Sequence, residues 1–278
     1  MRALILTMLL GGLAAANADD PQTLSARLLD DSRPAQERQS LIEKHPDLAA
    51  ELVAAMTASL PANDPKEEYR RIPWIWRVAV AAGKRNDEKS LRGLLDVSLP
   101  RPGETLRDWQ AVVIGGGVIN GISLAGKWPH ERIGDLLHGD EGLQKRWKQA
   151  LSAAATMADD EQVKKGTRYD ALRMIALDPT KESREHLTKY LAEGTDAELQ
   201  MGAVSGLSDI DAQEIAPLLI GHVQHMTPSN RTLAIDALLR SDARAKALLG
   251  AIESGTIAED WLSPQQKQAL RSQPQSKR

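Results

Sequence analysis

The feature that most constrains the fold of this chain is a motif that occurs three times in its C-terminal third. In each copy an alanine is followed by an aliphatic residue and, three positions later, by another. The copies begin 32 and 31 residues apart. They are Ala171-Leu172-x-x-Ile175, Ala203-Val204-x-x-Leu207 and Ala234-Ile235-x-x-Leu238. A single helical repeat of this length cannot bury its own apolar face, so we expect the copies to stack on one another.

Each copy of the motif is followed by an acidic residue and then by a second amphipathic segment. The acidic residues, which we expect to end the first helix, are Asp178, Asp209 and Asp242. The second segments are residues 186–191, 215–223 and 245–252. This pattern of one hairpin per repeat predicts an α-solenoid of stacked helical hairpins. The alternative is a helical bundle of unrelated hairpins.

The remainder of the chain also has a helical pattern. Apolar residues recur at helical spacing from residue 22 onward, with almost no alternation of the strand type. Pro46 is expected to open a strong helix, since proline suits the first helical position. Residues 61–65 carry a proline at each end and therefore interrupt the helical pattern. The sequence thus predicts an all-α fold with an internal boundary at this break.

Four segments follow from these patterns. Residues 1–18 are a predicted signal peptide, and residues 19–60 form an N-terminal helical segment. The solenoid spans residues 65–270. Its last helix should start after Ser263, which precedes a proline and lies three residues before a glutamine, as in a capping box. Residues 271–278 lack an apolar anchor and are a predicted disordered tail.

The first eighteen residues, MRALILTMLLGGLAAANA, have the features of a signal peptide. Arg2 gives a positive start, an apolar run follows, and Ala16 and Ala18 stand where a signal peptidase requires small residues. The run is shorter than the roughly 20 apolar residues that span a bilayer. We therefore expect cleavage after Ala18, no integral membrane span in the mature chain, and a periplasmic or secreted location in bacteria. An uncleaved anchor or a buried N-terminal helix is the alternative.

The composition of the chain, and the spacing of its histidine and acidic residues, argue against several classes of function. The chain has 35 basic and 38 acidic residues, a net charge of −3, so it lacks the basic surface that binds nucleic acid. It has no Cys, which excludes disulfides, thiolate metal sites, thiol nucleophiles and covalently attached haem. His222 and His225 are one turn apart without a further ligand. The adjacent Asp159 and Asp160 are typical of a helix start. We expect no metal, no cofactor and no catalytic residues.

A glycine-rich segment resembles a dinucleotide-binding turn. Residues 112–121 read VVIGGGVING, and such glycines allow backbone approach to a pyrophosphate after a first β-strand. However, Asn120 occupies the third glycine position, no second strand follows, and helical segments lie on both sides. These departures favour a glycine-rich helix that packs closely against a neighbour.

A dense aromatic and basic patch surrounds the Ile-Pro pair at residues 72–73. Its members, which we predict as the candidate partner-binding residues, are Arg70, Arg71, Trp74, Trp76 and Arg77. Stacking or cation–π contact would hold the partner. Residues two apart on a helix point to nearly opposite sides, so both tryptophans cannot line one shallow cleft. The alternative is that they supply core volume where Phe is missing while the arginines cover a helix end.

Two stretches resemble a known family. Residues 69–133 contain IPWIWRVAVAAGKRND and GKWPHERI, and residues 169–273 contain YDALRMIALDP and LSPQQKQALRSQP. Both are similar to the HEAT-like helical region of large secreted proteins of planctomycete-type bacteria, described as membrane-bound dehydrogenases or c-type cytochrome proteins. In fuller members that region lies between a β-propeller and a haem domain with Cys-x-x-Cys-His. This chain has no propeller-like segment and no Cys, so the resemblance implies the solenoid and export but not the redox site.

These features predict an exported, non-catalytic HEAT-like scaffold that binds another macromolecule, an unidentified protein, through its concave face. One alternative is an accessory subunit of a periplasmic c-type cytochrome or dehydrogenase system. Another is an enzyme that uses Gly115 to Gly117 or the Trp74/Trp76 region, with a flavin or a polysaccharide as the respective ligand. The sequence does not name the partner or the oligomeric state.

Overall fold

The computed structural model describes residues 20–58, 60–61, 64–99 and 107–272, and within them every regular element is a helix. The all-α prediction is therefore confirmed for these residues. The predicted signal peptide, with its cleavage after Ala18, lies outside them. Of the predicted tail, residues 271 and 272 belong to the last helix, and residues 273–278 lie outside the described ranges.

The described ranges contain fifteen α-helices and three short 3-10 helices. The α-helices are α1 (Pro21–Leu28), α2 (Ala35–Lys44), α3 (Ala49–Ala58), α4 (Pro65–Arg85), α5 (Glu88–Ser98), α6 (Gln110–Leu124), α7 (Pro129–Leu137), α8 (Glu141–Asp159), α9 (Lys165–Ile175), α10 (Lys181–Lys189), α11 (Ala197–Ser208), α12 (Ile215–His222), α13 (Pro228–Leu238), α14 (Asp242–Glu253) and α15 (Pro264–Ser272). The 3-10 helices are Pro46–Leu48, Val223–His225 and Glu259–Trp261.

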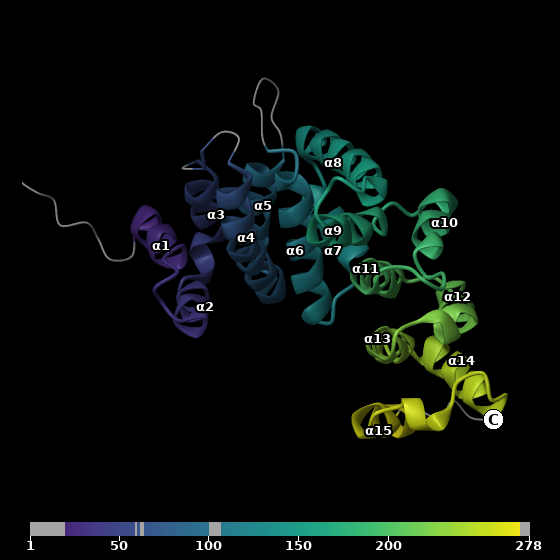
Figure 1. Ribbon diagram of the computed structural model, residues 1–278. Coiled ribbons are helices and arrows are strands. Elements are labelled where there is room, and N and C mark those ends of the chain that lie inside the picture. Colours follow the sequence, from purple (N-terminus) through teal and green to yellow (C-terminus); the bar gives the residue numbers. More distant parts are fainter. Residues whose placement is uncertain (1–19, 59, 62–63, 100–106, 273–278) are drawn as a thin grey trace, which may run out of the picture.

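Most helices contact helices that are one or two places along the chain. In one succession α2, α4, α6, α9, α11 and α13 pack against one another in that order. In another, α1, α3, α5 and α7 do so, and α12 packs against α14. Figure 1 shows the elements following a curved path from α1 at one end to α15 at the other. α15 joins α13 through Gln266, whose Nε2 donates to the Thr232 carbonyl and to Asp236.

A single aliphatic core runs through the described chain, from Leu24 in α1 to Leu262 before α15. Trp74 and Trp147 are its two aromatic members, in keeping with the absence of Phe. The break at residues 61–65 does not separate the core, because α3 packs against both α4 and α5. The predicted N-terminal segment therefore lies directly on the helices that follow it.

α4 and α6 pack closely because both carry glycine where they meet. A Cβ at Gly121 of α6 would overlap the Val80 carbonyl oxygen of α4, and a Cβ at Gly83 of α4 would overlap the Val118 carbonyl oxygen of α6. A Cβ at Gly117 would lie 2.8 Å from the Ala79 Cβ. The glycine-rich segment is thus a buried helix that packs tightly on its neighbour, as the sequence favours. The strand and turn of a dinucleotide-binding unit do not form there.

The repeated motif marks helices as predicted. Its three copies lie in α9, α11 and α13, and the second segments overlap α10, α12 and α14, with residues 190–191 beyond the end of α10 and residue 223 in the 3-10 helix that follows α12. The acidic residues behave differently from one another: Asp209 is the C-cap of α11, whereas Asp242 is the first residue of α14, after its N-cap Ser241. The prediction that Asp242 ends a helix is wrong, because the hydroxyl of Ser241 accepts the Arg244 N–H and starts one.

Three further predicted boundaries differ from the structure. Pro46 opens a 3-10 turn, and the α-helix proper begins at Ala49. Asp159 and Asp160 end α8 instead of starting a helix. The last helix has the predicted capping box, with Ser263 N–H donating to Gln266 Oε1 at 2.9 Å, but it continues to Ser272.

In the described ranges, no single helix has the length and hydropathy to cross a membrane. Only α6 and α7 taken together, with a bend of 119° between them, would be long and apolar enough.

Candidate functional site

A groove of about 640 Å³ lies between α4, the first turns of α9 and the start of α11. We call it the α4–α9 groove. It is lined by Tyr69, Ile72, Pro73, Trp76, Arg77, Lys164, Lys165, Gly166, Thr167, Tyr169, Asp170, Glu198 and Met201. Its volume is in the range that holds a small ligand or an anchoring side chain of a partner.

Helical spacing places these side chains on the groove. On α4, Tyr69, Pro73 and Trp76 are three or four residues apart and so lie along one face. On α9, Thr167 and Asp170 are three apart, so they lie on one face of the helix, and both line the groove. Tyr69 is 64% exposed, whereas Thr167 and Asp170 are buried at the base. The groove therefore has an aromatic wall and a polar floor.

Asp170, on the floor of the groove, has a strongly shifted pKa. The residue is only 4% exposed, and its Oδ1 accepts a hydrogen bond of 3.0 Å from the indole Nε1–H of Trp76. Burial raises the pKa of Asp170 well above its usual range, and the nearby Glu198 carboxylate raises it further. The Trp76 bond and Arg173 act in the opposite direction and do not cancel the effect of burial.

The charge of Arg173 acts on Asp170, but the hydrogen bonds of its guanidinium are made with other residues. One turn after Asp170, Arg173 pairs with Asp209 at 2.5 Å and donates to Asn120 Oδ1 at 2.8 Å. Although burial lowers the pKa of Arg173, the charge of Asp209 raises it above its usual value. Asp209 in turn accepts from Arg240 at 2.6 Å. This buried cluster joins α6, α9, α11 and α13 beside the groove but leaves Asp170 without an ion pair.

The basic residues of the groove also have other partners. Lys165 pairs with Asp196 at 2.6 Å, which raises the pKa of Lys165. The ammonium of Lys164 lies 6.0 Å from the ring centre of Tyr69. Arg77 turns away, with a hydrogen bond of 3.2 Å to Gln39 and its guanidinium 5.2 Å from the Trp74 ring. Within the described ranges, neither Asp170 nor Glu198 forms an ion pair.

The structure divides the predicted patch into two groups. Trp76 and Arg77 line the groove, whereas Arg70, Arg71 and Trp74 do not. Trp74 is 7% exposed and faces the other side of α4, beneath the Arg38 guanidinium at 4.3 Å. The two tryptophans thus point to opposite sides, as their spacing of two predicts.

Arg70 and Arg71 instead fix α4 to the helices before it. Arg70 pairs with Glu67 at 2.6 Å and donates to the Leu29 carbonyl after α1. Arg71 donates to the Met56 carbonyl of α3 at 2.7 Å. The hydrogen bond from Arg70 is the largest of the effects that lower the pKa of Glu67 to about 2. These arginines hold the N-terminal helices in place and are not available at the groove.

Asp170, Tyr169, Thr167 and Glu198 were not identified from the sequence. Trp76 and Asp170 are 94 residues apart, and no local pattern connects them. The spacing of Tyr69, Pro73 and Trp76 on one helical face was the available signal, but it is also the pattern of an ordinary buried face.

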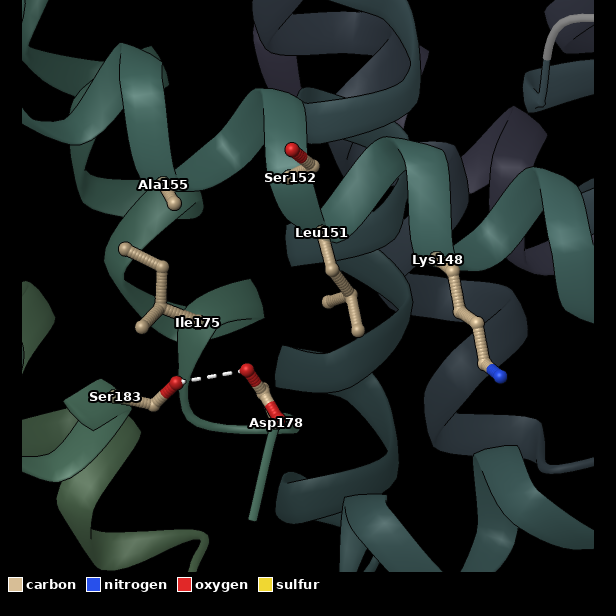
Figure 2. Close-up of a pocket in the computed structure, with 7 residues that line it drawn as sticks. All are labelled: Lys148, Leu151, Ser152, Ala155, Ile175, Asp178 and Ser183. Carbon is tan, nitrogen blue, oxygen red and sulfur yellow. Dashed lines mark hydrogen bonds between the residues drawn. The ribbon is translucent and has the colours of Figure 1, made fainter. Parts of the chain in front are cut away.

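A second cavity of about 410 Å³ lies under α8, next to the turn between α9 and α10. Figure 2 shows Leu151, Ser152 and Ala155 of α8 above Ile175 and Asp178. In the turn, Asp178 accepts hydrogen bonds from Ser183 at 3.0 Å and from Thr180 at 3.3 Å. These bonds fix the start of α10, so Asp178 serves the helix cap.

The histidine pair does not form a metal site. α12 ends at His222, whose Nδ1 lies 2.9 Å from the Leu218 carbonyl oxygen, and His225 follows in a 3-10 turn with Nδ1 3.7 Å from a Glu193 oxygen. In the ranges that the structure describes, no group of three or more His, Asp or Glu side chains is arranged to hold a metal ion.

Comparison with protein-family models, with curated proteins and with solved structures finds no match to this chain. The groove has an aromatic wall, the hydroxyl of the buried residue Thr167, and two carboxyl groups that form no ion pair in the described ranges. Chemically, such walls can stack on a flat group and accept its hydrogen bonds.

Proposed function

We propose that this chain is an exported scaffold, built as an α-solenoid of HEAT-like helical hairpins, that binds another protein in the α4–α9 groove. The proposal depends chiefly on the exposure of large apolar side chains. In the described part of the chain these are Tyr69, Leu124, Met201 and Leu249. Two of the four, Tyr69 and Met201, line the same groove although they are 132 positions apart in the chain. Apolar exposure gathered at one concave place is typical of a protein-binding surface.

Two further observations support this proposal. Successive contacts between α4, α6, α9, α11 and α13 agree with a stack of repeats in which each helix pair contacts its neighbours. The resemblance to the HEAT-like region of secreted bacterial proteins favours both the repeat type and export. The role needs neither a cofactor nor a catalytic residue.

A photo-crosslinking amino acid at position 69 tests the proposed groove in the producing cells. With p-benzoylphenylalanine in place of Tyr69, we expect one discrete adduct, and the same substitution at Leu249 of α14 serves as the matched exposed control. The adduct at position 69 should disappear when Met201→Asp is added. Equal adducts at both positions, or none at position 69, would count against the groove as the binding surface.

Export is tested separately by the N-terminus of the mature protein. We expect the periplasmic or secreted fraction to contain a chain that begins at Asp19, directly after Ala18. Mass spectrometry of the terminal peptide distinguishes this chain from one that retains Met1. A protein that keeps its first eighteen residues in the cytoplasm would contradict the predicted location.

A further inference from the structure

We propose that the α4–α9 groove receives the guanidinium group of an arginine side chain from the partner protein, against Trp76 and between Asp170 and Glu198. The inference takes the source of the arginine, a protein partner, from the proposed function. Its chemical basis is independent of that function and lies in three properties of the groove.

The first property is a buried carboxyl group without a cation. Asp170 is 4% exposed, and only Oδ1 is hydrogen-bonded, to the Trp76 indole. Within the described chain, Oδ2 accepts no hydrogen bond, and the adjacent hydroxyl of Thr167, a residue 5% exposed, makes none either. Burying a carboxyl group without a paired charge is costly. A cationic donor in the groove would remove that cost and would satisfy the hydroxyl as well.

The second property is that the protein's own cations do not fill this place. Arg173 is held by Asp209, and Lys165 is held by Asp196. Arg77 contributes to the groove wall, but its guanidinium lies on the Trp74 side of α4. The charge of Glu198 is therefore added to that of Asp170, and in the described chain the charges of Arg173 and Lys165 act on these carboxyl groups without an ion pair to either.

The third property is the tryptophan itself. Elsewhere in this chain a tryptophan ring carries an arginine guanidinium carbon 4.3 Å from its centre, in three separate pairs. These pairs are Arg38 with Trp74, Arg231 with Trp261, and Arg240 with Trp128. Trp76 carries no such cation among the described residues, although it lies beside an unpaired carboxyl group. The groove thus contains a tryptophan ring of the kind that binds an arginine elsewhere in this molecule, but here without the arginine among the described residues.

Arginine fits these walls better than lysine. A guanidinium is planar, stacks on an aromatic ring and has five N–H donors in a fixed fork. It can therefore meet Asp170, Glu198 and the Thr167 hydroxyl at once while it lies flat on Trp76. The ammonium of lysine is a compact charge that would pair with the carboxyl groups but would not stack on the aromatic wall.

The test uses the full chain and the capped tripeptide acetyl-Ala-Arg-Ala-amide as the probe. Its matched control replaces arginine by citrulline, which has nearly the same shape without the charge. Two-dimensional NMR follows the Trp76 indole N–H, which is assigned by its loss in Trp76→Phe. We expect a saturable shift with the arginine peptide and affinity lower by about tenfold or more with citrulline, since a hydrogen bond to a charged group is at stake.

Variants locate the site of binding. Asp170→Asn can keep the bond from Trp76 but carries no charge, and Glu198→Gln changes an exposed position at the rim. Each substitution should lower the affinity for the arginine peptide by about tenfold. Glu253→Gln, an exposed change of the same kind on α14, should leave its affinity unchanged.

Several results would overturn the inference. They are equal binding of the arginine and citrulline peptides, an unchanged affinity in both groove variants, and preferred binding of acetyl-Ala-Glu-Ala-amide. The last result would mean that the first turn of α9 takes an anion. If the adduct at position 69 forms but the arginine peptide does not bind, the inference fails and the proposed function stands. If the peptide binds and the adduct does not form, the proposed function fails alone.

Discussion

Asp209 illustrates how one side chain can hold four helices together. Its carboxylate is fully buried and accepts from Arg173 of α9, from Arg240 at the end of α13, and from Ser123 of α6 at 2.6 Å. The sequence correctly predicts a helix end at Asp209, because an acidic residue follows each motif copy. It does not predict that this one is buried, since its partners are 31 to 86 residues away.

Removing this carboxylate should destabilise the protein strongly. Asp209→Ala leaves the buried guanidinium of Arg173 and the partly buried guanidinium of Arg240 without this ion pair, so we expect the free energy of unfolding to fall by about 3–5 kcal/mol. Urea unfolding followed by circular dichroism measures the loss. Glu185→Ala, which breaks the exposed i,i+4 pair with Lys181, is the control and should leave the stability essentially unchanged. Similar losses in both variants would contradict the structural role of the cluster.

The buried carboxyl group of Asp170 has a consequence for the pH dependence of stability. Its pKa is raised above the ordinary value of 3.8 in the folded chain, so the folded state binds this proton more tightly than the unfolded state. Because of this difference in proton binding, the free energy of unfolding falls as the pH rises from the ordinary pKa of 3.8 through the raised pKa of the folded state. Asp170→Asn removes the ionisable group and therefore removes this loss.

We accordingly expect Asp170→Asn to be more stable than the wild type by at least about 1 kcal/mol at about pH 8, and by little at about pH 4. Urea unfolding of both proteins across this range gives the difference. Asp135→Asn, the same substitution at an exposed position of α7, serves as the matched control. A stability gain of Asp170→Asn that is constant across the range would show that Asp170 is ionised throughout.

At the scale of elements, the contact between α4 and α6 is the one in which two helices pack most extensively. Both helices present glycine at the crossing, and each glycine faces the partner's backbone. Gly121→Ala should therefore lower the stability by about 2 kcal/mol or more, because the added methyl group has no room. Gly134→Ala is the control within α7, where a Cβ meets nothing within 4 Å, and it should raise the stability by about 0.5–1 kcal/mol. Thermal unfolding of both variants decides whether α4 and α6 pack as closely as described.

The elements could be predicted from the sequence to a greater extent than the groove could. Repeated apolar spacing identifies α9 to α14 as helix pairs, because a helix face is a local property of the chain. The same reasoning identifies α6, where the departure at Asn120 argues against a nucleotide-binding turn. The groove depends on which side of α4 meets α9, and this is a tertiary property. Trp76 was therefore identified without Asp170, and Arg70 and Arg71 were assigned to a binding patch although they fix α1 and α3.

At the scale of the whole molecule, the arrangement of contacts predicts how the chain opens. α1 and α14 belong to opposite ends of the described path, and each packs mainly on helices close to it in sequence (Figure 1). In such an arrangement, damage to one end should spread to adjacent helices and no further. A globular core closed on itself would instead transmit the damage to every helix, since it unfolds as a single unit.

Leu248→Ala in α14 distinguishes these two behaviours. The side chain is fully buried, so its truncation should cost about 2–5 kcal/mol locally. Hydrogen exchange followed by mass spectrometry should then show faster exchange in α12, α13 and α14, with α1 to α5 unchanged. Leu28→Ala in α1, where the leucine is equally buried, is the matched control and should give the reverse pattern. If either substitution speeds exchange equally in all helices, the chain unfolds as one unit. That result would contradict the proposed solenoid, in which damage stays local. If each effect stays at its own end, Leu248→Ala leaves α4, which forms one wall of the α4–α9 groove, unchanged, and this wall can be studied in that variant.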